Sequence, residues 1–413
     1  MDSNQAIDLN AALARIASDV APMVDTERVP LGAAQGRILA EALRATHPAP
    51  PFPSSAMDGY ALPAPVSADL SGTRWRISGE SAAGHPWTGA ARDGECIRIL
   101  TGAAVPDGFT RVVLQEDTRR DGDVILISGQ PDPRSNIRPV GHDVQAGEPL
   151  MPQRQRLGAL EIGRLASDGV REVSVYRRPR IGVFSTGDEL VDAATTGADL
   201  PYGCIYESNR ATLLALLKHL PVAVTDLGNL PDDAQTTRRE LDVAARSHDL
   251  LLTSGGVSVG DHDHVRNVVE ALGYVAFWKL NLKPGKPLAF GRVGNSWFCG
   301  LPGNPVSTIV TWLLIARPLV LHLCGQPGSE PVRLPATLAT PAEHHAGRTE
   351  YQRGCFSWRP GQPLPVVSIL GDQSSNRLAT FQGANCLVEI PAAVHDLPAG
   401  APVTLLPLAG LLD

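Results

Sequence analysis

DLLLTSGGVSVGDHDH, residues 249–264, joins a short apolar run to a loop that is rich in glycine. The run DLLLT is typical of a strand that is buried on both faces of a sheet. The loop ends at an amphipathic helical pattern that begins at Val265. A buried strand that leads through such a loop into a helix is typical of an α/β domain, which binds ligands at the carboxyl ends of its strands.

The same alternation of strands and helices extends in both directions, from about Arg180 to Pro318. IGVFS and VAVTDLG have the composition of strands, whereas SNRATLLALLKHL and residues 233–246 have helical periodicity. Uniformly apolar strands between amphipathic helices predict a parallel sheet covered on both faces. The last apolar segment, residues 306–323, approaches the length of a membrane span but contains an arginine and a proline. We therefore interpret it as a buried core helix.

The glycine-rich loop is a candidate site for a phosphate and a divalent metal. Glycines let backbone N–H groups turn toward an anion, and the N-terminus of the following helix adds partial positive charge. Asp261 and Asp263 have the oxygen ligands that Mg²⁺ prefers. A tight turn with an aspartate N-cap remains the structural alternative, and His262 and His264 leave zinc as a further one. The predicted phosphate ligands are Ser254, Gly255, Gly256 and Ser258.

Three other groups of residues in this region suit the same ligand. Asp188 and Glu189 follow the strand IGVFS at its carboxyl end, where a metal or ligand would be met, although an acidic helix start is equally consistent. The segment WKLNLKPGKP brackets a Pro-Gly turn with three lysines, which suits an oxyanion but also a solvated basic loop. LPGNPV forms a rigid turn before the long helix. The residues concerned in the last two segments are Lys279, Lys283, Lys286, Pro302 and Pro305.

The rest of the chain reads as separate, smaller parts. Two short helices are expected near residues 11–20 and 31–43, and a third at residues 157–168, closed by Gly169; we expect the three to form one layer. Residues 54–139 have the turn-separated runs of a β module, and the tail after Pro327 those of a small barrel or sandwich. Loops of these parts contain further candidate site residues, namely Asp58, Arg138, Asp143, Arg353 and Ser375.

Composition limits the classes of function. The 413 residues have a net charge of −7, so no global field attracts nucleic acid or an anionic membrane. The six cysteines form no CxxC pair, which argues against a zinc finger or a disulfide framework. The N-terminal sequence MDSNQAIDLN lacks the basic and apolar regions of a signal peptide, so a cytoplasmic location is expected.

Ten motifs taken in order resemble the molybdopterin molybdenumtransferase family, which includes MoeA and the E domain of gephyrin. They are PSSAMDGYA, ILTGAAVP, IRPVGHD, FSTGDEL, ESNR, TSGGVSVGDHD, WKLNLKPGKPLAFG, LPGNPVS, YQRG and GDQSS followed by LATFQGAN. The resemblance covers the chain from about Leu9 to its C-terminus. It implies site roles for Asp58, Thr101, Arg138, Asp143, Asp188, Glu189, Asp232, Asp263, Lys279, Lys283, Pro302, Pro305, Arg353 and Ser375.

The resemblance implies the last step of molybdenum cofactor synthesis. In that step molybdate is inserted into adenylylated molybdopterin, the phosphoanhydride is hydrolysed with Mg²⁺, and AMP is released. By charge type, the lysines and Arg138 would bind molybdate and phosphate, while Asp188, Glu189 and Asp263 would organise Mg²⁺. A molybdopterin adenylyltransferase and a non-catalytic molybdopterin-binding scaffold are the alternatives. Proteins of molybdopterin adenylylation and of molybdoenzyme maturation are possible partners, and no nucleic acid or membrane is expected.

The resemblance also implies an elongated, L-shaped protomer with four domains and a homodimer whose active site is shared between subunits. In this chain the domains would be residues 1–30 with 141–178 (domain I, a helical layer), 46–140 (domain II, a β-rich module), 31–45 with 179–326 (domain III, a three-layer α/β domain) and 327–413 (domain IV, a small β-barrel). Asp58 and Asp143 would reach the ligand from the partner subunit.

Overall fold

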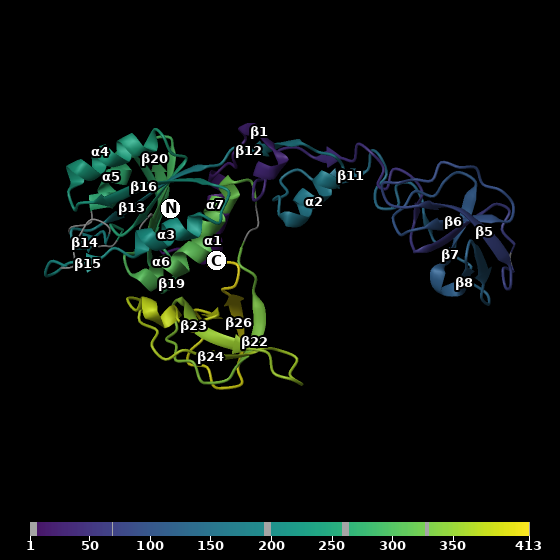
Figure 1. Cartoon of the computed structure of the whole chain (residues 1–413). Helices are drawn as coiled ribbons and strands as arrows, with labels where there is room; N and C mark the ends of the chain where they lie inside the picture. Colours follow the sequence, from purple (N-terminus) through teal and green to yellow (C-terminus); the bar gives the residue numbers. More distant parts are fainter. Residues whose placement is uncertain (1–5, 68, 194–199, 258–263, 327–329, 413) are drawn as a thin grey trace. The chain divides into compact units, whose positions relative to one another are not determined.

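The computed structural model describes residues 6–67, 69–193, 200–257, 264–326 and 330–412 (Figure 1). The chain forms two compact units. The larger unit contains Met1–Glu27, Gly36–Ile38 and Ser174–Asp413, and the smaller unit contains Arg28–Gln35 and Leu39–Val173. The chain passes between them along β1 (Thr26–Pro30) and β12 (Glu172–Tyr176).

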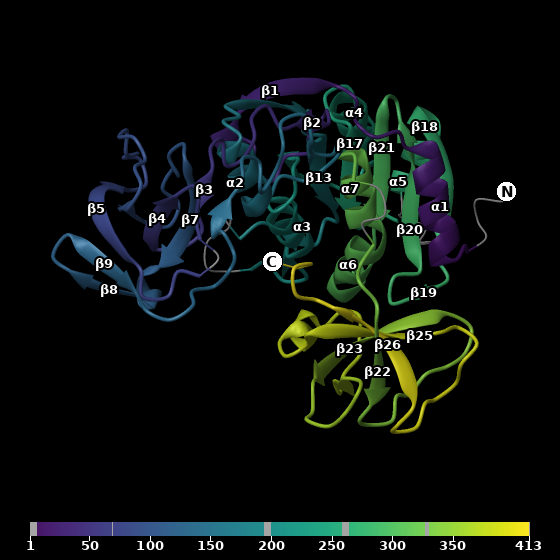
Figure 2. The same cartoon turned by 90° about the vertical axis from the view of Figure 1, so that its right-hand side faces the viewer.

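The core of the larger unit is a six-stranded sheet with the order β16-β13-β17-β21-β20-β18; β16 is labelled in Figure 1 and the other five strands in Figure 2. Its first four strands are parallel, as the sequence predicts, whereas β20 and β18 are antiparallel to their neighbours. Only two residues join β20 to β21, and so short a connection permits only antiparallel pairing. The strands are β13 (Arg180–Thr186), β16 (Ala223–Leu230), β17 (Leu250–Ser254), β18 (Gly273–Lys279), β20 (Pro287–Val293) and β21 (Ser296–Leu301).

Both faces of this sheet are buried. Phe184, Leu251 and Phe298 form one core with side chains from α4 and α5. Val183 and Leu252 alternate with them along their strands, face the opposite side and are also fully buried. The prediction of a covered sheet is therefore confirmed. The helices between the strands are α3 (Asn209–Leu217), α4 (Ala234–Ala245) and α5 (His264–Leu272).

A long apolar helix follows β21. It consists of α6 (Pro305–Thr311), a wider π-type turn (Trp312–Ala316) and α7 (Arg317–Leu323). The π-type turn suits Pro318, which has no N–H to donate and whose ring would clash with a regular α-helix. Its length and composition alone would allow it to cross a membrane, but 89% of its apolar stretch is buried inside the protein. The interpretation as a core helix is confirmed.

The C-terminal part of the larger unit is a closed five-stranded barrel. Pairing runs in the order β23-β24-β22-β26-β25, and β25 returns to β23. A short strand from the lysine-rich segment, β19 (Leu282–Lys283), adds to β23 in parallel. The barrel strands are β22 (Leu334–Leu338), β23 (Thr349–Ser357), β24 (Val366–Ile369), β25 (Cys386–Ile390) and β26 (Pro402–Pro407).

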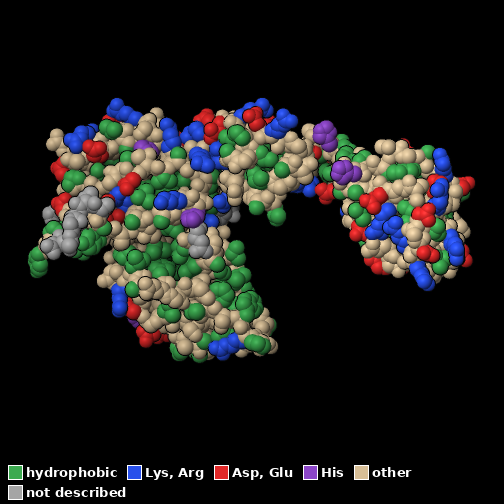
Figure 3. All heavy atoms as spheres, viewed as in Figure 1, with side chains coloured by type: hydrophobic (Ala, Val, Ile, Leu, Met, Phe, Trp, Pro, Cys, Tyr) green, Lys and Arg blue, Asp and Glu red, His purple; other side chains and the backbone are tan. Residues whose placement is uncertain are grey.

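The smaller unit contains the predicted β module, a six-stranded sheet with the order β7-β4-β6-β5-β9-β8. Both faces of this sheet are apolar. Cys96 and Ile97 are consecutive residues of β6, so they point to opposite faces, and each belongs to a different hydrophobic core. Its strands are β4 (Gly59–Pro63), β5 (Arg74–Ser81), β6 (Glu95–Ile99), β7 (Phe109–Leu114), β8 (Thr118–Asp121) and β9 (Val124–Ile127). On the face seen in Figure 3, basic and acidic side chains are interspersed, in keeping with the modest net charge.

The expected helical layer is wrong in two respects. Residues 31–43 form no helix: a single 3₁₀ turn (Leu31–Ala33) is followed by Gly36 at φ 76°, which a helix cannot include, and by β2 (Leu43–Arg44), which pairs with β11 (Pro149–Met151). The helices α1 (Leu9–Asp19) and α2 (Ala159–Ser167) are present as predicted. They lie in different units, however, and α1 packs against α7.

Candidate functional site

Loops at the carboxyl ends of β13, β17 and β21 line a cavity of about 750 Å³ in the larger unit. This is the edge of a parallel sheet at which α/β domains bind ligands. The cavity brings together residues from six of the sequence motifs. The predicted site residues among its lining are Glu189, Asp232, Ser254, Gly255, Gly256, Pro302 and Pro305.

The glycine pair after β17 has a backbone conformation that favours glycine. Gly255 has φ 88° and Gly256 has φ 65°. The Gly255 N–H donates to the Leu301 carbonyl at 3.1 Å, which ties the loop to the end of β21. A Cβ atom on Gly255 would lie 2.7 Å from the Thr186 carbonyl oxygen, so the loop also packs closely against the end of β13. Positive φ and close packing together explain the two glycines.

Hydroxyl groups gather where β13 and β17 end. The side-chain oxygens of Ser185, Thr186 and Thr253 are buried and have no hydrogen-bond partner among the residues that the structure describes. A buried hydroxyl without a partner is costly, by about 1–3 kcal/mol. Thr186 lines the cavity, and its hydroxyl oxygen is buried against the Gly255-Gly256 turn, 2.7 Å from where a Cβ atom on Gly256 would lie.

Carboxylates border the same cavity. Glu189 and Asp232 line it, and the Asp188 Oδ1 atom accepts a hydrogen bond from the Asp232 N–H at 3.1 Å. Within the described ranges, no group of three or more His, Cys, Asp or Glu residues could hold a metal ion. Mg²⁺, however, is often bound by only one or two carboxylates together with phosphate oxygens, so the oxygen donors of Glu189 and Asp232 fit this ion. Ser258 and Asp263 lie outside the described residues.

The start of α3 is a part of the site that the sequence reasoning missed. Residues 205–209 line the cavity, with β15 (Ile205–Tyr206) pairing in parallel with β14 (Leu190–Val191). The Asn209 side chain donates to the Gly303 carbonyl at 2.7 Å, which joins the start of α3 to the turn before α6. The signal was the ESNR motif, whose Asn209 begins a helix that follows directly on a predicted loop.

A loop of the barrel completes the cavity. Asn376 and Leu378 line it, and Ser375 binds both the residue that precedes α6 and the first turn of that helix. Its hydroxyl accepts from the Asn304 side chain at 3.2 Å, and its carbonyl accepts from the Val306 N–H at 3.1 Å. The predicted residue Ser375 therefore holds the barrel loop to the helix start.

Arg353 of β23 supports the same loop. It is fully buried, and its guanidinium donates to the carbonyls of Asp372 at 3.0 Å and Ser374 at 3.2 Å. Burial lowers the pKa of Arg353. Its Nη1 atom has no partner among the described residues. Arg353 thus holds the loop in place by binding the loop's backbone carbonyls.

A second cavity of the larger unit, of about 690 Å³, lies between β19 and the barrel. Of the three predicted lysines, Lys283 lines it. Lys279 ends β18, and Lys286 directly precedes β20, with which β18 pairs. Residues 371–374, which lie in the loop that Arg353 supports, line the same cavity.

The smaller unit holds the remaining predicted residues. The Asp58 Oδ1 atom accepts hydrogen bonds from the Thr101 N–H at 2.7 Å and from its hydroxyl at 2.8 Å. The bond from the Thr101 backbone, followed by that from its hydroxyl, lowers the pKa of Asp58, so this carboxylate stays ionised at neutral pH.

Arg138 and Asp143 line one cavity of about 490 Å³ in that unit. Arg138 lies on β10 (Ile137–Arg138), which pairs with β3 (Ser54–Ser55). The Asp143 Oδ2 atom lies 4.0 Å from the Arg164 Nη1 atom. The smaller unit thus joins two pairs of the predicted residues, Asp58 with Thr101 and Arg138 with Asp143.

Comparison with protein families matches almost the whole chain in three consecutive parts. Residues 7–169 match the MoeA N-terminal region (domain I and II), and residues 182–322 match a probable molybdopterin binding domain. Residues 335–408 match the MoeA C-terminal region (domain IV). The order of the three matches is that of the motifs in the sequence.

Whole-chain relatives agree with these matches. The chain is 37% identical to a molybdopterin molybdenumtransferase of Haemophilus influenzae, over 98% of this chain and 100% of that protein. It is 33% identical to one of a Nostoc species, over 93% and 89%. Gephyrin of Dictyostelium discoideum is 31% identical over 92% of this chain, which spans 59% of that longer protein. A solved MoeA protein from Pyrococcus horikoshii, 26% identical, has a TM-score of 0.80 over 98% of this chain and 100% of that one.

Proposed function

This chain belongs to the MoeA family of molybdopterin molybdenumtransferases, and we propose that the cavity at the carboxyl ends of β13, β17 and β21 binds its adenylylated molybdopterin substrate. The observation that carries the proposal is the Gly255-Gly256 turn, in which both glycines have positive φ angles. Beside it, the ends of β13 and β17 contain buried hydroxyl groups that have no partner among the described residues. The Gly255 N–H donates to the Leu301 carbonyl, so the N–H groups that follow it in the turn would meet an anion, without interference from side chains.

The residues of the cavity divide the work on the phosphoanhydride. The backbone of the Gly255-Gly256 turn would bind and orient the phosphate oxygens. Water adds across the phosphorus–oxygen bond, so that one phosphate stays on molybdopterin and the other leaves as AMP. Glu189 and Asp232 would hold Mg²⁺, which supplies neutralisation of the charge on the phosphates.

Molybdate binds in the second cavity, beside Lys283. A lysine ammonium is a compact point charge with three donors, and it suits a tetrahedral oxyanion. The neighbouring loop of residues 371–374 adds polar backbone to this cavity. The lysine charge does not distinguish molybdate from tungstate, so both oxyanions are expected to bind.

The central test is a reconstituted reaction. Purified full-length protein is incubated with adenylylated molybdopterin, Mg²⁺ and molybdate, and the release of AMP and the metal-loaded cofactor are measured. Both products are expected in equal amounts. Absence of AMP release would refute the proposal, and consumption of ATP with formation of adenylylated molybdopterin would favour an adenylyltransferase instead.

Glu189→Gln is expected to raise the Mg²⁺ concentration for half-maximal AMP release about tenfold, because one of the two carboxylates of the metal site loses its charge. The measurement is AMP release against Mg²⁺ concentration at saturating molybdate. Asp242→Asn, at an exposed ion pair on α4, removes the same charge far from the cavity and serves as the control. An unchanged Mg²⁺ requirement in Glu189→Gln would contradict the role of this carboxylate.

The proposal includes a homodimer in which Asp58, Thr101, Arg138 and Asp143 serve the site of the partner. Its support is that Asp58 binds Thr101 and that Arg138 and Asp143 line one cavity, all within the smaller unit. Asp58→Asn and Asp232→Asn are each expected to lower activity about tenfold. When the two variants are mixed and refolded together, half of the dimers should contain one subunit of each kind. Each such dimer has one intact site out of two, so about a quarter of the wild-type activity should be recovered. No recovery, or a monomer by light scattering, would refute the shared site.

A further inference from the structure

A buried carboxylate lies beside the second cavity. The Glu350 side chain is only 3% exposed, and its two oxygens bind different partners. Oε1 lies 3.0 Å from the Lys283 ammonium, and Oε2 lies 2.7 Å from the Nδ1 atom of His344. Because a carboxylate accepts hydrogen bonds, His344 donates from Nδ1.

The fold fixes these three side chains in place. β19 and β23 pair in parallel with Lys283 opposite Glu350, so the backbone register brings the ion pair together. His344 is buried, and its backbone N–H donates to the Asp396 Oδ1 atom at 2.7 Å. Glu350 therefore cannot move away from Lys283 without disturbing the barrel.

Lys283 is different, because 45% of its side chain is exposed. Its ammonium can turn between Glu350 and the cavity, and a lysine side chain has the rotatable bonds to do so. An oxyanion that binds Lys283 meets a cation whose charge is already matched by a buried carboxylate.

We propose that Glu350 limits the oxyanion affinity of this cavity by competing for Lys283. The inference rests on the proposed function, in which Lys283 binds molybdate. Glu350 acts through Lys283, the residue that binds the substrate, and is therefore a positioning residue. To bind Lys283, an oxyanion must replace the Glu350 carboxylate as the partner of the ammonium group. Oxyanions that make further contacts in the cavity can do so, whereas weakly bound oxyanions such as sulfate are disfavoured.

The test is a double-mutant cycle on the full-length protein with molybdate as the titrant and calorimetry as the measurement. Glu350→Gln keeps the shape of the side chain and removes its charge, and it is expected to lower the molybdate dissociation constant about tenfold, the ratio typical of one charge-assisted contact. Sulfate binding should tighten as well. Lys283→Met should weaken molybdate binding about tenfold, and adding Glu350→Gln to it should change the constant by less than about twofold.

Glu343→Gln is the matched control. Glu343 is an exposed carboxylate that lines the same cavity, so this variant removes an equal charge from the cavity and leaves the buried pair intact. Equal tightening in Glu343→Gln and Glu350→Gln would overturn the inference, because the effect would then be one of overall charge. Unchanged or weaker binding in Glu350→Gln would also overturn it, as would an undiminished effect in the Lys283→Met background.

Three further outcomes have defined consequences. If Glu350→Gln shows no cooperative unfolding transition, Glu350→Asp replaces it. The shorter side chain keeps its charge near His344 but lies farther from Lys283, so molybdate binding should tighten about threefold. No tightening in Glu350→Asp would overturn the inference. If Lys283→Met binds molybdate as the wild type does, the proposed role of the cavity fails. If Lys283→Met weakens binding and Glu350→Gln has no effect, only the competition fails.

Discussion

Gly255→Ala is expected to lower the rate of AMP release about 100-fold. The added methyl carbon would lie 2.7 Å from the Thr186 carbonyl oxygen, and the backbone at φ 88° is strained for any residue with a side chain. The loop must therefore shift away from the end of β13, and a displacement of about 1 Å at a reacting group costs on the order of 100-fold in rate. The measurement is single-turnover AMP release at saturating Mg²⁺ and molybdate.

Gly303→Ala provides the control for that experiment. Gly303 lines the same cavity, but the nearest atom to an added methyl group, the Gly255 Cα, is 3.7 Å away, an ordinary contact. This variant adds the same atoms to the cavity without strain and should stay within about threefold of the wild type. Equal losses in both variants would show that filling the cavity, and not the conformation of the glycine turn, reduces the rate.

The position of this cavity could be predicted from the sequence because of a property of parallel sheets. IGVFS and DLLLT each contain an uninterrupted apolar run, which identifies strands buried on both faces. Parallel strands end at the same edge, so the residues that follow them meet in space. Glu189 and Gly255 were therefore expected near each other, and both line the cavity.

Local pattern failed where pairing with distant residues decides the structure. Residues 31–43 have apolar side chains at helical spacing, but the Leu39 N–H donates to the Gln155 carbonyl and β2 pairs with β11. These bonds satisfy the backbone in an extended form, and Gly36 breaks the helix between them. The apolar stripe of α1 likewise showed that the helix packs, but not that it packs on α7.

The second cavity depends even more on distant contacts. The sequence shows three lysines around a Pro-Gly turn and an unremarked glutamate before the YQRG motif. Only the parallel pairing of β19 with β23 places Lys283 opposite Glu350. Register between segments so far apart is set by the closed barrel, and the sequence left open whether the tail forms a barrel or a sandwich.

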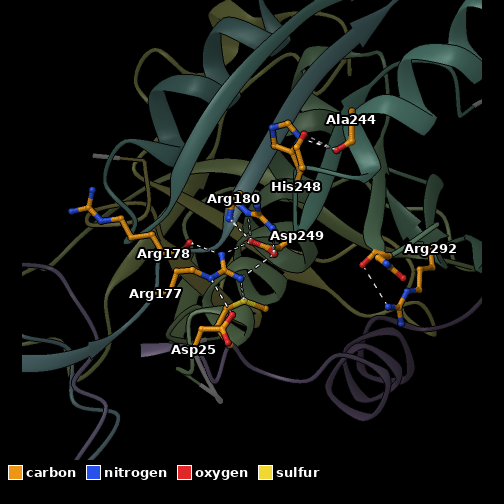
Figure 4. A network of polar contacts seen from close by, with 11 residues as sticks. Asp25, Arg177, Arg178, Arg180, Ala244, His248, Asp249 and Arg292 are labelled. Carbon is orange, nitrogen blue, oxygen red and sulfur yellow. Dashed lines mark hydrogen bonds and ion pairs between the residues drawn. The ribbon is translucent and has the colours of Figure 1, made fainter. Parts of the chain in front are cut away.

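A network of polar contacts around Asp249 lies at the opposite edge of the central sheet (Figure 4). Asp249 directly precedes β17, and its carboxylate accepts hydrogen bonds from the Arg177 Nη1 atom at 2.8 Å and from the Arg180 N–H at 2.7 Å. Arg177 also pairs with Asp25 at 3.3 Å, which ties the N-terminal segment to the sheet. Burial raises the pKa of Asp249, but the bonds from Arg177 and Arg180 outweigh it and lower the pKa to about 2.

Asp249→Asn is expected to lower the free energy of unfolding of the larger unit by about 2–3 kcal/mol at pH 7. The Asp249 side chain is 12% exposed, so solvent screens its ion pairs little, and the lowered pKa corresponds to a stabilisation of about this size. The variant also leaves the Arg177 guanidinium without its main counter-ion. The change is measured by urea denaturation, with tryptophan fluorescence as the signal for unfolding.

The pH dependence gives this prediction its sign. Because folding lowers the pKa of Asp249, the unfolded chain binds the proton more tightly, and the stabilisation is present above about pH 4, the ordinary value for Asp. It is lost as the pH falls through the folded-state pKa of about 2. The difference between wild type and Asp249→Asn should therefore be constant from pH 5 to pH 8 and shrink steadily below about pH 4. Asp242→Asn, at an exposed ion pair with Arg246, should change stability by less than about 0.5 kcal/mol at every pH. A difference for Asp249→Asn that persists undiminished at the acid end would mean that its carboxylate stabilises the fold by packing and not by charge.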